Sequence, residues 1–183
     1  MKEFLFENGQ LPAKSVLFIF ECGYKNIKEY AYPILTRYRI PALIFLVVNH
    51  IGDVNRWGNE KEHILTIDDI SELNKSLLVT FGLQSKSNND LTSVDDEQLT
   101  DEIIKSKAIL EEIIRYNVDY FNYPQGKYNI NVVDKLREAD IPMAFIDEKD
   151  KVTKLRDYLL IPSIKLSQAD SYWKLLAKLR LIE

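Results

Sequence analysis

An acidic and a thiol side chain, Glu21 and Cys22, directly follow an apolar segment at residues 16–20. Such a run ahead of a glycine, here Gly23, is typical of a central strand of an α/β sheet or barrel. Side chains at the carboxyl end of such a strand face the region in which ligands bind. A carboxylate there can act as a general base, and a thiol can act as a metal ligand or a nucleophile. The pattern therefore predicts a functional site, with a buried and inert thiol as the simpler interpretation of Cys22.

The chain has few histidines that could bind a metal or transfer a proton. Only His50 and His63 occur, neither lies in a motif, and both are most simply interpreted as surface or helix-edge residues. The single cysteine excludes an internal disulfide, and the sequence has no Cys/His group with zinc-finger spacing. Because no histidine is placed to act as its base, Cys22 gives little support to a cysteine hydrolase.

The composition is that of an ordinary globular protein, with 46% apolar and 28% charged residues among 183. A formal net charge of −4, without a basic run, argues against nucleic acid as the main partner. The longest apolar run, residues 41–48, is far shorter than the roughly 20 residues that span a bilayer. The first nine residues lack the apolar core of a signal peptide, so we expect a cytoplasmic protein unless a leader was removed.

Strand-like and helix-like segments alternate along the chain, and no linker or repeat divides it, so we predict one domain over residues 1–183. Repeated βα units favour a mainly parallel sheet with helices outside, and periodicity leaves an open doubly wound sheet and a barrel as alternatives. We expect Thr66 to cap the second helix with Asp69 in the reciprocal position, and Ser93 to cap the third. The expected strands cover residues 16–20, 42–48, 77–81, 118–123, 142–146 and 158–164. The expected helices cover residues 26–38, 66–75, 93–116, 131–139 and 168–181, with a charged connector at 147–154.

Several short segments resemble, in the same order, the polysaccharide deacetylases of the NodB type. Residues 15–24 resemble the strand and first motif of that family, and residues 40–45 resemble its next strand. Residues 121–126, Phe-Asn-Tyr-Pro-Gln-Gly, resemble its third motif. Each match is weak alone, but together and in order they are specific, and they extend from about residue 9 to residue 164. The resemblance implies an α/β fold, a distorted (β/α) barrel of the NodB type, which is TIM-like and often has seven strands.

The same resemblance shows that the metal-binding positions are altered. The family's metal-binding aspartate corresponds to Cys22, and its two histidines, four residues apart, correspond to Gln84 and Asn88. A neutral amide oxygen is a poor ligand for zinc, which prefers imidazole, thiolate and carboxylate. Lys86, between the two amides, adds positive charge that opposes a cation. We therefore predict that the divalent metal of the family, such as zinc, is not retained as a cofactor.

The resemblance also assigns the catalytic and substrate positions. Glu21 stands at the position of the catalytic base, one methylene longer than the family's aspartate, and the amide of Gln125 is the implied oxyanion donor. Asn122 replaces an arginine that orients the base in many members, and the general-acid histidine has no counterpart. Asn122, Tyr123 and Trp57 are candidate substrate-binding residues, with core or rim packing as the alternative for the aromatic rings.

These positions predict a polysaccharide deacetylase-like protein of carbohydrate metabolism that lacks metal-dependent deacetylase activity. It would be a pseudoenzyme of cell-surface polysaccharide metabolism, which serves as a sugar-binding or complex-forming module without catalysis. The alternative is an active carbohydrate N- or O-deacetylase, or another hydrolase, with a non-standard site that uses Glu21 and Cys22. A weaker option is a scaffold that forms a homo-oligomer or pairs with a paralogue. We expect an open, water-filled groove lined by Glu21, Cys22, Gln84, Asn88 and Tyr123.

Overall fold

The computed structural model describes residues 15–58, 60–147, 157–167 and 170–180. By their packing, the residues fall into two units: Phe18–Lys165, and the two ends of the chain, Met1–Leu17 with Leu166–Glu183. The prediction of one domain over residues 1–183 stays a prediction.

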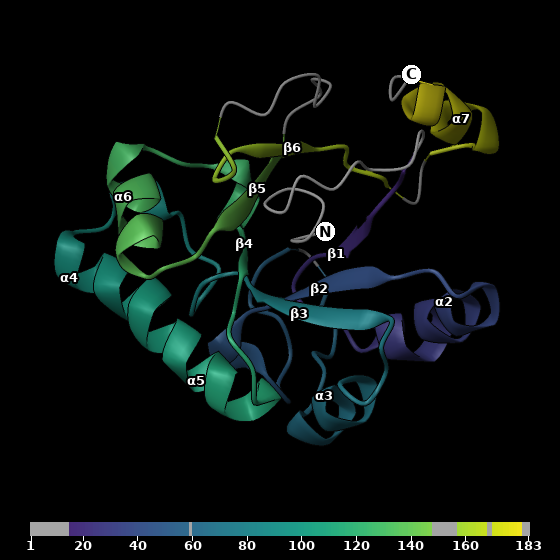
Figure 1. Cartoon of the computed structure of the whole chain (residues 1–183), viewed down its shortest axis with the longest axis horizontal. Coiled ribbons are helices and arrows are strands. Elements are labelled where there is room, and N and C mark those ends of the chain that lie inside the picture. Colours follow the sequence, from purple (N-terminus) through teal and green to yellow (C-terminus); the bar gives the residue numbers. More distant parts are fainter. Residues whose placement is uncertain (1–14, 59, 148–156, 168–169, 181–183) are drawn as a thin grey trace. The chain divides into compact units, whose positions relative to one another are not determined.

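A parallel sheet of six strands forms the centre of the Phe18–Lys165 unit, and each strand pairs with the next one along the chain (Figure 1). This order continues in one direction as in a barrel, whereas a doubly wound sheet reverses its order at a switch point. The predicted distorted (β/α) barrel is therefore confirmed, and the doubly wound alternative is excluded. The strands are β1 (Phe18–Phe20), β2 (Ala42–Leu46), β3 (Val79–Leu83), β4 (Tyr120–Asn122), β5 (Met143–Asp147) and β6 (Ile161–Ser163).

The central strands are buried on both faces. Every residue of β2 is buried, as expected for a continuous apolar strand in a parallel sheet. The predicted strand at residues 77–81 is displaced by two positions, because Leu77 is fully exposed and the ladder with β2 extends to Leu83. The shift places Gln84 directly after the strand, at its carboxyl end.

Helices surround the outer face of the curled sheet (Figure 1). The first runs through Ile27–Ala31 and α2 (Tyr32–Tyr38), and the second is α3 (Ile67–Leu73). The longest consists of α4 (Asp96–Leu99), a π-helical stretch at Thr100–Lys105 and α5 (Ser106–Ile114). The next helix is α6 (Ile130–Glu138).

Local caps explain where two of these helices begin. The Thr66 hydroxyl accepts from the Asp69 amide at 3.1 Å and the Asp69 carboxylate accepts from the Thr66 amide at 3.0 Å, which confirms the predicted cap of α3. The predicted cap of the long helix at Ser93 is wrong. Ser93 ends a short 3-10 turn, and Asp95 caps α4 by accepting from the Gln98 amide at 2.8 Å.

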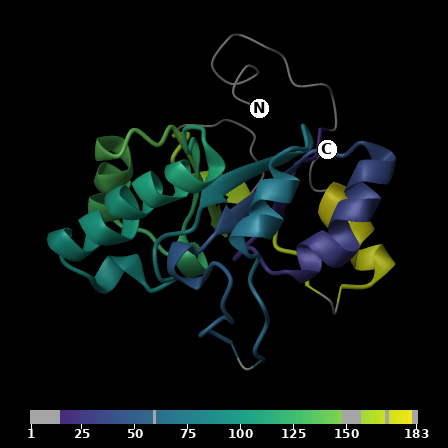
Figure 2. The same ribbon diagram turned by 90° about the horizontal axis from the view of Figure 1, so that it is seen from below.

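The segment between β2 and α3 projects away from the sheet (Figure 2). Two antiparallel bridges hold it: Tyr24 pairs with Ile64, and Val54 pairs with His63. Because one bridge involves Tyr24, the segment is attached next to the end of β1, and it carries Trp57.

In the second unit, α7 (Tyr172–Arg180) follows Asp170, whose carboxylate lies 2.9 Å from Lys174 Nζ and 2.6 Å from Lys178 Nζ. This helix falls within the predicted range of 168–181, of which residues 168, 169 and 181 lie outside the described part. Residues 148–154 of the predicted connector also lie outside it. Among the described helices, none has the length and apolar character that a membrane span requires.

Candidate functional site

The candidate site lies at the carboxyl ends of the strands. Glu21 and Cys22 follow β1, Gln84 follows β3, and Gln125 lies in the turn after β4. Because the strands are parallel, these ends meet at the same edge of the sheet, where ligands of such folds bind. The fold thus brings together residues that are far apart in the sequence.

A buried hydrogen-bonded network joins Cys22, Gln84 and Asn88, whose exposed fractions are 5%, 1% and 9%. The Cys22 amide donates to Gln84 Oε1 at 3.0 Å, and Gln84 Nε2 donates to Asn88 Oδ1 at 3.0 Å. Gln84 Nε2 also lies 3.4 Å from Cys22 Sγ. The three positions that the resemblance assigned to metal ligands are therefore neighbours in space.

This network does not fit a divalent metal. A cation needs lone pairs that converge on it, whereas Gln84 directs N–H donors toward both Cys22 Sγ and Asn88 Oδ1. Burial, followed by the charge of Glu21, raises the pKa of the Cys22 thiol to about 12, so the ligand form of sulfur is scarce at neutral pH. In the described ranges, no group of three or more His, Cys, Asp or Glu side chains is placed to hold a metal ion.

The backbone is strained at the same place. The non-glycine residues Cys22, Ser85, Asn88 and Gln125 have φ values of 62°, 60°, 63° and 59°, in the left-handed region. The Ser85 hydroxyl accepts from the Asn88 amide at 3.0 Å and helps to hold this loop. Such outliers cluster at functional sites, so they support the location of the site independently of its side chains.

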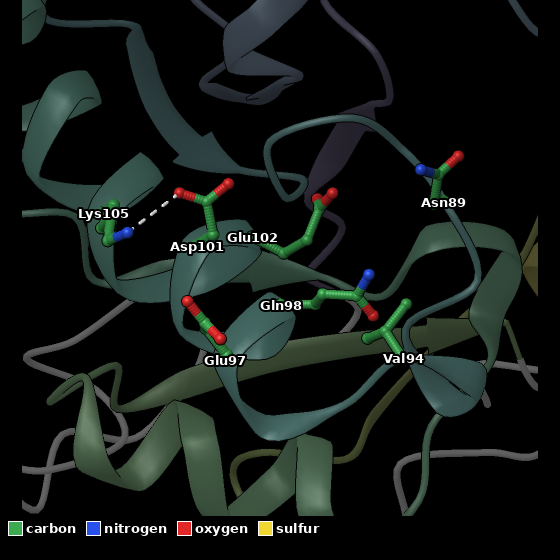
Figure 3. Close-up of a pocket in the computed structure, with 7 residues that line it drawn as sticks. All are labelled: Asn89, Val94, Glu97, Gln98, Asp101, Glu102 and Lys105. Atoms are coloured by element: carbon green, nitrogen blue, oxygen red, sulfur yellow. Dashed lines mark ion pairs between the residues drawn. The ribbon is translucent and has the colours of Figure 1, made fainter.

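The long helix also holds the 85–88 loop in place, through Glu102. The Glu102 carboxylate on the long helix accepts from the backbone amides of Lys86 and Ser87, both at 3.0 Å. Glu102 also lines a hollow of about 430 Å³, and Asn89, which directly follows the loop, lines it too (Figure 3). Figure 3 shows the Asp101–Lys105 ion pair on the same helix. The hollow is lined by Asn89, Val94, Glu97, Gln98, Asp101, Glu102 and Lys105.

Glu21 differs from the network below it because its side chain is 32% exposed. Its carboxylate lies 3.6 Å from Lys165 Nζ, and the same ammonium lies 3.1 Å from the Asp147 carboxylate. Burial raises the pKa of Glu21, Lys165 lowers it in part, and Asp147 raises it further. Glu21 is thus a partly desolvated carboxylate with a cationic neighbour.

Aromatic side chains border Cys22. The Trp57 indole donates to the Tyr24 hydroxyl at 2.8 Å, and the His50 ring packs edge-on against Trp57 with a centroid distance of 4.9 Å. The surface assignment of His50 is wrong, since it is buried in a 3-10 turn after β2, and its Nδ1 lacks a hydrogen-bond partner in the described part of the chain. Trp57 is half-buried, whereas His63 is exposed as expected.

Tyr123 and Asn122 occupy the core. Tyr123 is only 1% exposed and its hydroxyl donates to the Leu159 carbonyl oxygen at 3.0 Å, while Asn122 is also buried. Neither side chain is exposed in this structure, and the assignment of Asn122 and Tyr123 as substrate-binding residues stays a prediction. The expected open groove is wrong, because Cys22, Gln84 and Tyr123 are closed off from solvent. Gln125 is exposed in its turn.

Comparison with known proteins identifies the family. The family model described as polysaccharide deacetylase matches residues 8–144. The chain belongs to the polysaccharide deacetylase family. This domain is 26% identical over 177 residues to the poly-beta-1,6-N-acetyl-D-glucosamine N-deacetylase of Staphylococcus aureus. That match covers 91% of this chain and 60% of the relative, so the domain spans about 60% of the length of the curated relative.

Solved structures of this polysaccharide deacetylase fold agree with the arrangement of strands. IcaB from Ammonifex degensii has a TM-score of 0.79 at 23% identity, with 98% of this chain and 78% of that one covered. A mutant of BA3943, described as a CE4 family pseudoenzyme with restored enzymatic activity, has a TM-score of 0.57 at 17% identity. That match covers 73% of this chain and 45% of the other. At these identities the likeness supports the fold alone.

The sequence analysis of this polysaccharide deacetylase domain missed Asp147, Lys165 and Glu102. Asp147 ends β5 and Lys165 follows β6, so the rule that placed Glu21 at the end of a strand could have indicated both. Glu102 carries no such signal, because it lies within a long charged helix and its contact with the 85–88 loop is tertiary.

Proposed function

We propose that this polysaccharide deacetylase domain is a sugar-binding or complex-forming module of carbohydrate metabolism without metal-dependent deacetylase activity. The observation that carries the proposal is the network of Cys22, Gln84 and Asn88, which satisfies its own hydrogen bonds. The activated water of a metal-dependent hydrolase needs a cation held by strong ligands. A buried thiol and two amides do not supply them.

The exposed edge above this network suits a polar ligand. Glu21 and Asp147 offer carboxylate acceptors, and Gln125 offers an amide. Trp57 adds a half-buried aromatic side chain, a type that packs on the apolar face of a sugar. The name of the Staphylococcus aureus relative supports a polymer of N-acetylglucosamine as the ligand class.

A fold of this kind can lose activity and remain folded, as the description of the BA3943 mutant as a pseudoenzyme with restored activity indicates for that protein. The precedent supports the proposal for this domain. A homo-oligomer or a paralogue partner is the complex-forming version of the same proposal, and size measurement in solution tests it.

A second candidate function rests on Glu21. Burial raises the pKa of its carboxyl group, which is a property of carboxylates that act as general acid or base. Glu21 would activate water against an amide or ester without a metal, and Gln125, which is exposed in the turn after β4, would offer its amide to the oxyanion. This activity would be an N- or O-deacetylase of non-standard chemistry.

One titration separates the two functions. Oligomers of N-acetylglucosamine and of glucosamine are added to isotope-labelled protein, with a glucose oligomer as the control ligand, and acetate is measured in parallel. Binding predicts amide shifts around Glu21 and Gln125 that weaken in Gln125→Ala but not in Gln98→Ala, whose side chain is exposed on α4. Acetate release that Glu21→Gln abolishes would instead establish the second function. The absence of both shifts and acetate would contradict both.

A further inference from the structure

Lys165 links two carboxylates at the strand ends. Its Nζ donates to Asp147 Oδ2 at 3.1 Å and lies 3.6 Å from Glu21 Oε2. Neither carboxylate is fully exposed, since the side chains of Asp147 and Glu21 have exposed fractions of 28% and 32%. A carboxylate that has lost part of its hydration is stabilised by a nearby cation more strongly than one in bulk water.

This contact joins the two edges of the sheet. Glu21 follows β1 and Lys165 follows β6, which lie at opposite ends of the strand order. Across the described strands, backbone pairing runs from β1 through to β6 and does not connect these two directly. The Lys165 side chain therefore bridges the seam of the distorted barrel on the face where the candidate site lies.

Asp147 fixes the ammonium on the other side. Asp147 is in register with Ser163 of β6, and the Ser163 hydroxyl donates to the Ile146 carbonyl oxygen at 2.9 Å. The turn that carries Gln125 packs on the same residue, because a Cβ added at Gly126 would lie 2.7 Å from Asp147 Cβ. Gly126 has a φ of +68°, so glycine suits both the close approach and the conformation of this turn. The ammonium is thus tied to the turn of Gln125.

We propose that Lys165 is a positioning residue, which holds the Glu21 carboxylate toward the exposed surface next to Gln125 and so fixes the acceptor that a sugar ligand meets. Among the residues that the structure describes, the charged and titratable groups that face Glu21 are Lys165, Asp147 and Cys22. Cys22 is uncharged at neutral pH. Burial and Asp147 both disfavour the ionised form of Glu21, and the positive charge of Lys165 favours it. Only the ligand measurement below rests on the proposed function.

The test compares Lys165→Met with Lys165→Arg and with Lys105→Met. Lys105 is a matched control, since its side chain is 64% exposed against 61% for Lys165 and it also forms an ion pair, with Asp101 at 3.4 Å. The Glu21 carboxyl carbon is followed by nuclear magnetic resonance through a pH titration, and Glu21→Gln identifies its signal. Lys165→Met removes the cation and is expected to shift the pH midpoint of the Glu21 titration upward. Lys165→Arg is expected to keep the native midpoint, and Lys105→Met is expected to leave it unchanged.

The ligand readout is affinity for an N-acetylglucosamine oligomer. We expect Lys165→Met to weaken it about tenfold, as for a displaced hydrogen bond to a charged group, and Lys165→Arg to retain it. An unchanged Glu21 midpoint in folded Lys165→Met overturns the positioning role. A shifted midpoint in a protein that binds no oligomer supports the link between Lys165 and Glu21 and contradicts the proposed function instead.

Discussion

Replacing Gln84 with alanine tests whether the network is a structural unit. The change removes the acceptor of the Cys22 amide and the donor to Asn88 Oδ1, both at 3.0 Å and both buried. A buried polar group left without its partner costs about 1–3 kcal/mol, so two such groups predict a loss of roughly 2–6 kcal/mol in the free energy of unfolding. Water that enters the vacated space lowers this cost, and we expect about 3 kcal/mol.

The measurement is urea unfolding followed by far-ultraviolet circular dichroism, with the midpoint and slope compared between variants. Gln98→Ala is the matched control, because Gln98 is exposed and its side chain accepts one capping bond from the Asp95 amide at 3.1 Å. Its loss is expected to be about 1 kcal/mol or less. Gln84→Met keeps most of the volume and separates the hydrogen bonds from the cavity. If Gln84→Ala loses no more stability than Gln98→Ala, the network is not the structural unit described above.

The remaining predictions concern the metal and the thiol. After dialysis, elemental analysis is expected to find no stoichiometric zinc, cobalt or nickel, and a value near one metal per chain would contradict the pseudoenzyme proposal. The triple variant Cys22→Asp, Gln84→His and Asn88→His is expected to take up zinc by calorimetry, and a folded variant without uptake would show that the family's motif was wrongly aligned to this chain. In the native protein, the rise of the Cys22 pKa from 9.0 to about 12 predicts alkylation at pH 8 roughly a thousandfold slower than in urea. A native thiol that is alkylated as fast as the unfolded one would refute the raised pKa. Because the pKa of Cys22 is higher in the folded state, the contribution of this thiol to stability is present below about pH 9 and is lost as the pH rises toward 12.

The parts of the fold that could be predicted are those fixed by local chemistry. The apolar run of β2 and the Thr66–Asp69 cap each have a pattern that admits one structure. The cap of the long helix does not, since Ser93 and Asp95 both precede residues suited to a capping box three positions later. A 3-10 turn at Leu91–Ser93, which Asp90 caps by accepting from the Thr92 amide at 3.0 Å, contains Ser93 and leaves Asp95 as the cap.

The candidate site also has parts that the sequence predicts and parts that depend on tertiary structure. The positions of Cys22, Gln84 and Asn88 followed from a motif with fixed spacing, and the structure brings them into contact. The burial of Tyr123 could not be read from its neighbours, because its hydroxyl partner, the Leu159 carbonyl oxygen, belongs to a later segment. The pairing of Lys165 with Glu21 depends on how far the sheet curls, which no local pattern encodes.

The closed network of Cys22, Gln84 and Asn88 also bears on how such a site can change over generations. A single substitution toward a metal ligand, such as Gln84→His, breaks the bonds to the Cys22 amide and to Asn88 and gains no cation in exchange. The Gln84→His variant is therefore expected to be less stable than its parent, and a metal site forms only when all three positions carry ligands. The three positions are therefore expected to be epistatic, so that the effect of a substitution at one of them depends on the residues at the other two.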